Sequence, residues 1–243
     1  MRIFVGMETS GALRRAFDAR GHHTISCDTL PPEDDAHTEG HLHRSAHWQG
    51  DVFEALQSLA GFGWRPDAAI FHPDCTFLTN SAAWAFTDGP YHQAVKPTTL
   101  VGGARRAARE DAISTVRLIA SQDIPRIIIE NPPGSLSTRW RPPTQIVQPW
   151  MFGDDASKAT CFWFVGKEWE TLEPPGLAID PAQRCPGRMV EWPRGSGKMV
   201  ERWSNQTDSG QNRLTPGDDR WKHRARTYPG IAGALVARIE AGA

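Results

Sequence analysis

The sequence predicts an α/β fold in which a parallel sheet is covered by helices on both faces. Short apolar segments alternate along the chain with longer segments whose apolar residues recur at helical spacing. The short segments are apolar throughout, which is typical of parallel strands that are buried on both faces. Hydrophobic residues make up 39% and charged residues 23% of the 243 positions, which is a globular composition of ordinary domain size.

The first half of the chain alternates strands and helices. A helix is expected over 10–20 because Leu13 and Phe17 share one face, and Ser10 is its expected N-cap. A second helix, over 51–60, also carries its apolar residues on one face. Strands are expected at the apolar runs that cover residues 2–6, 23–27 and 68–71.

The second half continues the pattern and then departs from it. The longest helix is expected over 103–121, and further strands are expected over 126–130, 145–148 and 160–165. Residues 172–221 are rich in Pro, Gly, Arg and Trp and read as a small irregular insertion, after which a final helix is expected over 230–240. We therefore expect a main domain formed by 1–171 plus 222–243, and a separate small region formed by 172–221.

Charge is distributed unevenly along the chain. The formal net charge is −1, but residues 1–60 carry 5 basic and 9 acidic side chains, whereas residues 184–226 carry 10 basic and 5 acidic ones. Tryptophans are interleaved with the basic residues. This asymmetry is expected where one face of a neutral protein meets a polyanion.

Several classes of protein are excluded. No apolar run approaches the roughly 18 residues of a membrane span, and the start of the chain lacks the form of a signal peptide, so we expect a cytoplasmic protein without membrane contact. The four cysteines form no CxxC pair, which disfavours a structural zinc site and a disulfide framework. We expect no metal site at the histidines of the acidic stretch between Asp28 and Asp51, which are His37, His41, His43 and His47.

Chemically useful residues follow the expected strands at their carboxyl ends, where ligands bind in parallel sheets. Gly6 opens a turn between a strand and a helix, in which main-chain N–H groups can approach a ligand. Asp28 follows the second strand, at the position where an acidic residue holds ribose hydroxyls in nucleotide-binding sheets. Asp51 opens a helix and is either a cofactor ligand or an N-cap.

A cysteine and a glutamate follow two further strands. Cys75 lies in the loop His72-Pro73-Asp74-Cys75-Thr76, where a core cysteine is not expected, and Glu130 ends a strand before Asn131-Pro132. A thiol and a carboxyl group on one sheet edge suit covalent catalysis on a heterocycle, in which the thiolate adds to the ring and the acid stabilises charge on a ring nitrogen.

The order of these motifs resembles that of the DNA cytosine-5 methyltransferases. These enzymes show a glycine loop, two acidic positions, Pro-Cys and Glu-Asn-Val in the same sequence. The chain looks most like short phage and prophage members, in stretches that cover QIVQPWMFG (145–153), KATCFW (158–163), RWSNQTDSGQN (202–212) and RTYPGIA (226–232). Two departures are that Asp74 stands in place of a proline, and that Thr76 rather than Gln follows the cysteine.

The resemblance implies a Rossmann-like S-adenosylmethionine-dependent methyltransferase fold with a mixed sheet. It implies that Cys75 adds to C6 of a flipped cytosine, that Glu130 binds N3 and the exocyclic amine, and that C5 takes the methyl group. Lys158 is the expected support for the flipped base. The residues expected to bind S-adenosylmethionine are Phe4, Gly6, Met7, Glu8, Ser10, Gly11, Asp28, Asp51, Val52 and Pro73.

The same resemblance implies double-stranded DNA as partner of a monomeric protein in a bacterial or phage-infected cell, with a role in protection against restriction. The main domain is then catalytic, and 172–221 is the target-recognition region. The residues expected to contact DNA are Arg202, Trp203, Ser204, Asn205, Gln211 and Asn212.

Two alternatives stay open at this stage. Asn131-Pro132-Pro133 resembles the motif of methyltransferases that act on exocyclic N4 or N6 amines, although Gly134 stands where those enzymes have an aromatic residue. The other alternative is a catalytically silent DNA-binding relative. It stays open because Asp74 replaces the proline expected before the cysteine.

Overall fold

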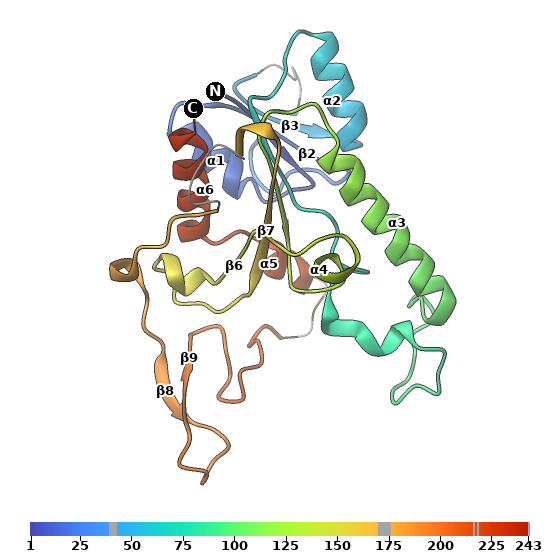
Figure 1. Ribbon diagram of the computed structural model, residues 1–243, viewed down its shortest axis with the longest axis vertical. Coiled ribbons are helices and arrows are strands. Elements are labelled where there is room, and N and C mark those ends of the chain that lie inside the picture. Colours follow the sequence, from blue (N-terminus) through green and yellow to red (C-terminus); the bar gives the residue numbers. More distant parts are fainter. Residues whose placement is uncertain (39–42, 170–175, 216, 218, 243) are drawn as a thin grey trace.

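The computed structural model describes residues 1–38, 43–169, 176–215, 217 and 219–242. Its centre is a seven-stranded sheet with the strand order β3-β2-β1-β4-β5-β7-β6 (Figure 1). Strands β1 to β5 are parallel to one another in this sheet, whereas β7 is antiparallel to both β5 and β6. This mixed sheet with helices on both faces confirms the predicted α/β, Rossmann-like fold.

The elements agree with most of the expected segments. The strands are β1 (Arg2–Gly6), β2 (His23–Asp28), β3 (Ser45–Gln49), β4 (Ala68–Phe71), β5 (Ile127–Asn131), β6 (Gln145–Val147), β7 (Thr160–Val165), β8 (Arg188–Glu191) and β9 (Met199–Arg202). The α-helices are α1 (Ala12–Ala19), α2 (Val52–Gly61), α3 (Gly102–Ala120), α4 (Leu136–Arg139), α5 (Arg220–Ala225) and α6 (Pro229–Ala241). Short 3-10 helices cover Asn80–Phe86, Pro149–Phe152, Lys167–Trp169 and Pro181–Gln183.

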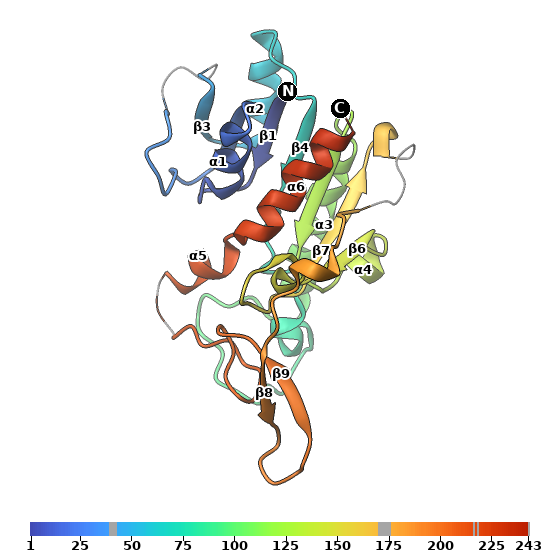
Figure 2. The ribbon, with the colours of Figure 1, turned by 90° about the vertical axis from the view of Figure 1, so that its left-hand side faces the viewer.

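Two hydrophobic layers hold the sheet between helices. Successive side chains of a strand point to opposite faces, so Phe4 packs in the layer that contains residues of α2 and α3, while Ile3 packs in the layer that contains residues of α1 and α6. Figure 2 shows α1 and α6 side by side on one face of the sheet. None of the described helices is long and apolar enough to cross a membrane.

Three local expectations are corrected. The N-cap of α1 is Gly11 rather than Ser10, because the chain turns into the helix through a left-handed residue with φ of 65°. The acidic stretch between Asp28 and Asp51, in which no strand was expected, contains the edge strand β3, whose few apolar residues gave a weak signal. The irregular region contains the hairpin β8–β9, and the helix α5 begins at its end.

The hairpin projects away from the central sheet and is paired only within itself (Figure 1). None of its strand residues is buried, which explains why alternation of apolar and polar residues did not reveal it. The expected domain boundary between residues 171 and 172 lies outside the described residues, and the two-part division stays a prediction.

Candidate active site at the carboxyl ends of the strands

The exits of β1, β2 and β4 are joined by main-chain hydrogen bonds. The N–H of Met7 donates to Cys27 O at 2.7 Å, and the N–H of His72 donates to Gly6 O at 3.0 Å. The expected cofactor turn and the expected catalytic loop are therefore neighbours.

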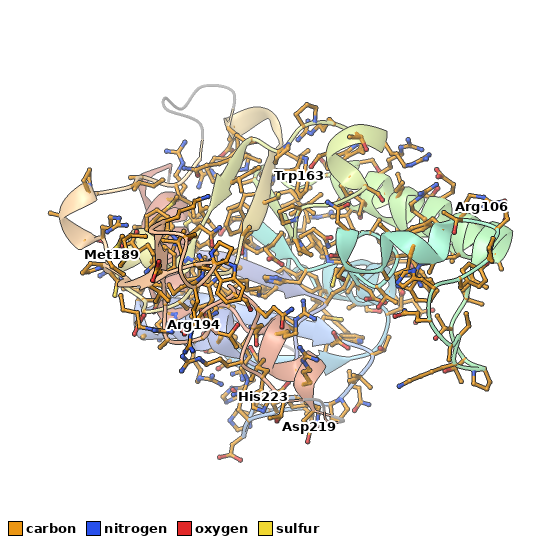
Figure 3. All side chains as sticks on the ribbon, turned by 90° about the horizontal axis from the view of Figure 1, so that it is seen from below. Arg106, Trp163, Met189, Arg194, Asp219 and His223 are labelled. Atoms are coloured by element: carbon orange, nitrogen blue, oxygen red, sulfur yellow. The ribbon has the colours of Figure 1, made fainter. Side chains whose placement is uncertain are left out.

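Figure 3, a view from below, shows the outlying parts of the molecule. Met189 of the hairpin and Arg106 of α3 lie on opposite sides, and His223 of α5 lies near the lower edge of the view.

The turn between β1 and α1 requires glycine at one position for lack of space. A Cβ on Gly6 would lie 2.5 Å from Cδ1 of Phe71, which is closer than van der Waals contact permits. Glu8 in the same turn is buried, and its Oε1 accepts hydrogen bonds from Ser10 Oγ and from the N–H of Ala12. Its Oε2 is buried without a hydrogen-bond partner among the described residues. A donor from a ligand would satisfy this oxygen.

Asp28 and Asp51 each use one carboxylate oxygen to shape their own loop. Oδ1 of Asp28 accepts the N–H of Leu30 at 2.9 Å. Oδ1 of Asp51 accepts the N–H groups of Phe53 at 2.8 Å and Glu54 at 3.1 Å, so Asp51 is the N-cap of α2. None of these bonds involves Oδ2. Asp51 can therefore serve as a cap and still present an oxygen to a cofactor.

The loop that carries Cys75 is shaped by the unexpected Asp74. Its Oδ1 accepts hydrogen bonds from the N–H of Thr76 at 2.9 Å and from Thr76 Oγ1 at 2.6 Å, an arrangement typical of aspartate at turns. Main-chain N–H groups of Leu78 and Thr79 then donate to Cys75 O at 3.0 and 2.9 Å. Asp74 and Thr76 thus build the turn together, and the thiol is half-buried within it.

The electrostatic surroundings of Cys75 join the three expected catalytic residues. Burial raises the pKa of the Cys75 thiol, and the negative charges of Asp74 and Glu130 raise it further. The positive charge of Lys158 acts in the opposite direction. Glu130 and Lys158 line one narrow pocket and their charges both act on Cys75, so the three residues belong to one cluster.

Glu130 is held ionised within this cluster. Burial alone would raise its pKa, but the hydrogen bond with His72 and the positive charge of Lys158 outweigh burial, so the pKa lies below its ordinary value. Nδ1 of His72 lies 3.2 Å from Oε2 of Glu130. Lys158 Nζ also donates to the main-chain oxygens of Ala225 at 3.5 Å and Arg226 at 3.3 Å. These contacts bring the residues that precede α6 to the catalytic cluster.

Two contacts at this site were not predicted. The His72 imidazole reaches Glu130, although the sequence showed His72 only as the residue after a strand. Nδ2 of Asn131 donates to Pro73 O at 2.7 Å, which ties the end of β5 to the catalytic loop. A histidine directly after a buried strand, beside a strand that ends in glutamate, was the available signal for the first contact.

The residues expected to contact DNA divide into two groups. Trp203 is buried, and its ring stacks on Trp150 with centroids 5.1 Å apart. Asn205 donates from Nδ2 to Ser157 O at 2.9 Å and accepts the N–H of Ser157 at 3.0 Å. Ser204 and Arg202 likewise bond to main-chain oxygens, of Asp155 and Asp208.

The contacts of Trp203, Ser204 and Asn205 attach the hairpin to the segment between β6 and β7, whereas the bond of Arg202 stays within its own region. Gln211 and Asn212 are exposed, as is Ser204. Contact of any of the six with DNA stays a prediction.

Within the described part of the chain, no group of three or more His, Cys, Asp and Glu side chains is arranged to hold a metal ion. His41, one of the clustered histidines in the sequence, lies outside the described residues.

Comparison with known proteins gives only distant structural likenesses. No protein-family model and no curated protein matches the chain. A crystal structure of a triple mutant of Spodoptera frugiperda DNMT2 matches with a TM-score of 0.38 and 15% sequence identity, over 74% of this chain and 53% of that one. The chain thus spans about half the length of this structure. At such distance the match says nothing of function, and the fold assignment rests on strand order and direction.

Proposed function

We propose that the protein is a DNA (cytosine-5)-methyltransferase that uses S-adenosylmethionine. The observation that carries this proposal is the cluster of Cys75, Glu130 and Lys158 at the carboxyl ends of β4, β5 and the start of β7. A thiol, an ionised carboxylate and an ammonium group in one cluster are the groups needed to add to a pyrimidine ring and to hold it during the addition.

The proposed reaction assigns a role to each group. The Cys75 thiolate forms a bond to C6 of a cytosine that has been swung out of the duplex. The proton that the Cys75 thiol releases passes to N3, and Glu130, ionised because of His72 and Lys158, accepts hydrogen bonds from the exocyclic amine and from the new N3–H group. C5 then takes the methyl group that the bound donor supplies, and loss of the C5 proton and of the thiol restores the aromatic ring. Because the pKa of Cys75 is raised, the group enters the reaction as a thiol that has a proton to release.

The residues around the first turn fit the proposed donor. S-adenosylmethionine carries an ammonium group, ribose hydroxyls and an adenine amine, all of which can donate hydrogen bonds. The site offers the unpartnered Oε2 of Glu8, together with Asp28 and Asp51, whose loop-forming bonds use Oδ1. Each polar part of the donor therefore has a carboxylate of suitable chemistry along the strand ends.

Double-stranded DNA is the proposed partner. Basic residues are concentrated between 184 and 226, and this segment includes the projecting hairpin and α5. Binding that relies on such residues should weaken steeply as salt rises, because counterions are released from the phosphates.

Two contacts weigh against an enzyme acting on exocyclic amines. The Asn131 side chain is buried and donates to Pro73 O instead of lying free for a base. A Cβ on Gly134 would lie 1.9 Å from Leu78 O, so the aromatic ring that such enzymes require at this position has no room.

Analysis of methylated nucleosides tests the proposal. Incubation with duplex DNA and labelled S-adenosylmethionine is expected to yield 5-methylcytosine, and Cys75→Ser is expected to yield none. Cys185→Ser is a matched control, because Cys185 is also half-buried but lies beside the hairpin. N4-methylcytosine or N6-methyladenine would contradict the proposal, and absence of any product with the wild-type protein would favour the silent relative.

A further inference from the structure

We propose that His72 is a positioning residue for Glu130, so that one face of the carboxylate is fixed by the imidazole and the other is left for the target base. This proposal rests on the proposed function, since it assigns the cluster of Cys75, Glu130 and Lys158 to cytosine chemistry. His72 itself is not expected to touch the base or the donor.

Three contacts hold the imidazole in place. The main-chain N–H of His72 donates to Gly6 O at 3.0 Å, which anchors the residue to the end of β1. The following residue, Pro73, accepts the hydrogen bond from Asn131 Nδ2 at 2.7 Å. Between these two anchors, Nδ1 of His72 lies 3.2 Å from Oε2 of Glu130. The imidazole therefore has little freedom to turn away from the carboxylate.

The hydrogen bond determines which ring nitrogen of His72 carries a proton. The ionised carboxylate of Glu130 can only accept, so Nδ1 of His72 must carry the proton that is shared with Oε2. Nε2 of His72 is buried without a partner among the described residues. His72 lines a narrow pocket together with Thr160, Thr227 and Tyr228, whose hydroxyl groups are of the kind that hold an ordered water molecule.

The position of His72 joins the donor turn to the base-binding acid. Its main chain is bonded to the last residue of β1, directly before the turn that contains Glu8, while its side chain is bonded to Glu130. A shift of the carboxylate by even a fraction of an ångström would misplace the bonds to N3 and to the amine, and catalysis is sensitive to such misplacement. The imidazole thus supplies orientation rather than chemistry.

Two substitutions separate the hydrogen bond from the bulk of the ring. His72→Asn keeps an N–H donor at the place of Nδ1, because the amide nitrogen of asparagine matches that ring atom, whereas His72→Leu removes the donor. Single-turnover methyl transfer is expected to fall about tenfold to a hundredfold in His72→Leu, the loss typical of a hydrogen bond to a charged group, and clearly less in His72→Asn. His23→Asn is the matched control, since His23 is the first residue of β2, at the opposite end of the strands from the site, and contacts Trp64 there.

The pH dependence of the methyl-transfer rate distinguishes a positioning role of His72 from a purely structural one, because loss of a structural contact alone would not shift it. The groups facing Glu130 are His72, Lys158, Cys75 and, on β7, Cys161. Loss of the imidazole leaves burial less opposed, so the pKa of Glu130 rises and the acidic limb of the rate profile moves to higher pH in His72→Leu. The limb is expected to stay near its original place in His72→Asn, and donor affinity is expected to be unchanged in both.

A measurement without turnover keeps the two proposals distinguishable. Nitrogen NMR of the wild-type protein is expected to show a protonated Nδ1 on His72, and this signature is expected to change in Glu130→Gln. An unprotonated Nδ1, or equal rates and equal profiles for wild type and His72→Leu, would overturn the role of His72. If the wild-type protein makes no 5-methylcytosine while Nδ1 is protonated as expected, the proposed function fails and the contact stands.

Discussion

The catalytic loop packs so closely against the segment after β5 that adding a single methyl group there should disturb it. Gly134 pairs with Thr79 in an antiparallel bridge, and the N–H of Ser135 donates to Leu78 O at 2.7 Å. In Gly134→Ala the new Cβ would lie 1.9 Å from Leu78 O and 2.9 Å from the Cα of Thr79. Both atoms belong to the main chain, so the loop that begins at Cys75 has to move.

The cost follows from two contributions. Forcing a methyl group into a packed site costs about 1–3 kcal/mol, and loss of the Ser135 hydrogen bond adds about 0.5–1.5 kcal/mol. Gly134→Ala is therefore expected to lower the free energy of unfolding by about 1.5–4.5 kcal/mol. Gly233→Ala is the matched control, because Gly233 lies in α6 with no atom within 4 Å of an added Cβ, and it is expected to raise stability by up to about 1 kcal/mol.

Urea unfolding followed by far-ultraviolet circular dichroism measures both changes. Formation of the covalent adduct with DNA that contains 5-fluorocytosine reports on the loop itself, and Gly134→Ala is expected to form it more slowly than Gly233→Ala. A Gly134→Ala protein that unfolds at the wild-type urea concentration would refute the close packing of the loop against Gly134.

Three further predictions concern single side chains. Asp51→Ala is expected to lower the free energy of unfolding by about 0.5–2 kcal/mol, because the N-cap of α2 is missing. Asp51→Asn keeps the cap but is expected to bind S-adenosylmethionine more weakly, and calorimetry of both variants measures the two effects. Asp74 contributes to the raised pKa of Cys75, so this pKa is expected to fall in Asp74→Asn, and iodoacetamide should then modify Cys75 faster at a fixed pH near 8. An unchanged rate of modification would show that the charge of Asp74 does not act on Cys75. Trp203→Ala is expected to cost about 3–5 kcal/mol of stability by emptying a buried site, while Gln211→Ala is expected to leave stability unchanged and to weaken DNA binding in a mobility-shift assay.

Strand positions were the most predictable part of the fold. The apolar runs of β1, β4 and β5 are continuous because both faces of these strands are buried, and the functional residues follow directly at their ends. Edge and projecting elements carry no such signal. In β3 only Ala46 and His47 are buried, and in the hairpin Met189 and Met199 are exposed.

The site was predictable in its residue types but not in its contacts. Sequence order identified Cys75 and Glu130, since both follow buried strands. The bond between His72 and Glu130 depends on β4 and β5 being neighbours, which is a property of the sheet order rather than of either segment. Burial of Trp203 depends in the same way on Trp150, a residue distant in sequence, and favours packing over base stacking for its ring.

The central claim is that Cys75 forms a bond to the target base. The most direct measurement is peptide mapping by mass spectrometry of the protein trapped on DNA that contains 5-fluorocytosine in the presence of S-adenosylmethionine. The modified nucleotide is expected on the peptide that contains Cys75, with no adduct in Cys75→Ser. An adduct on another residue, or one that persists in Cys75→Ser, would contradict the assignment of Cys75 as the nucleophile.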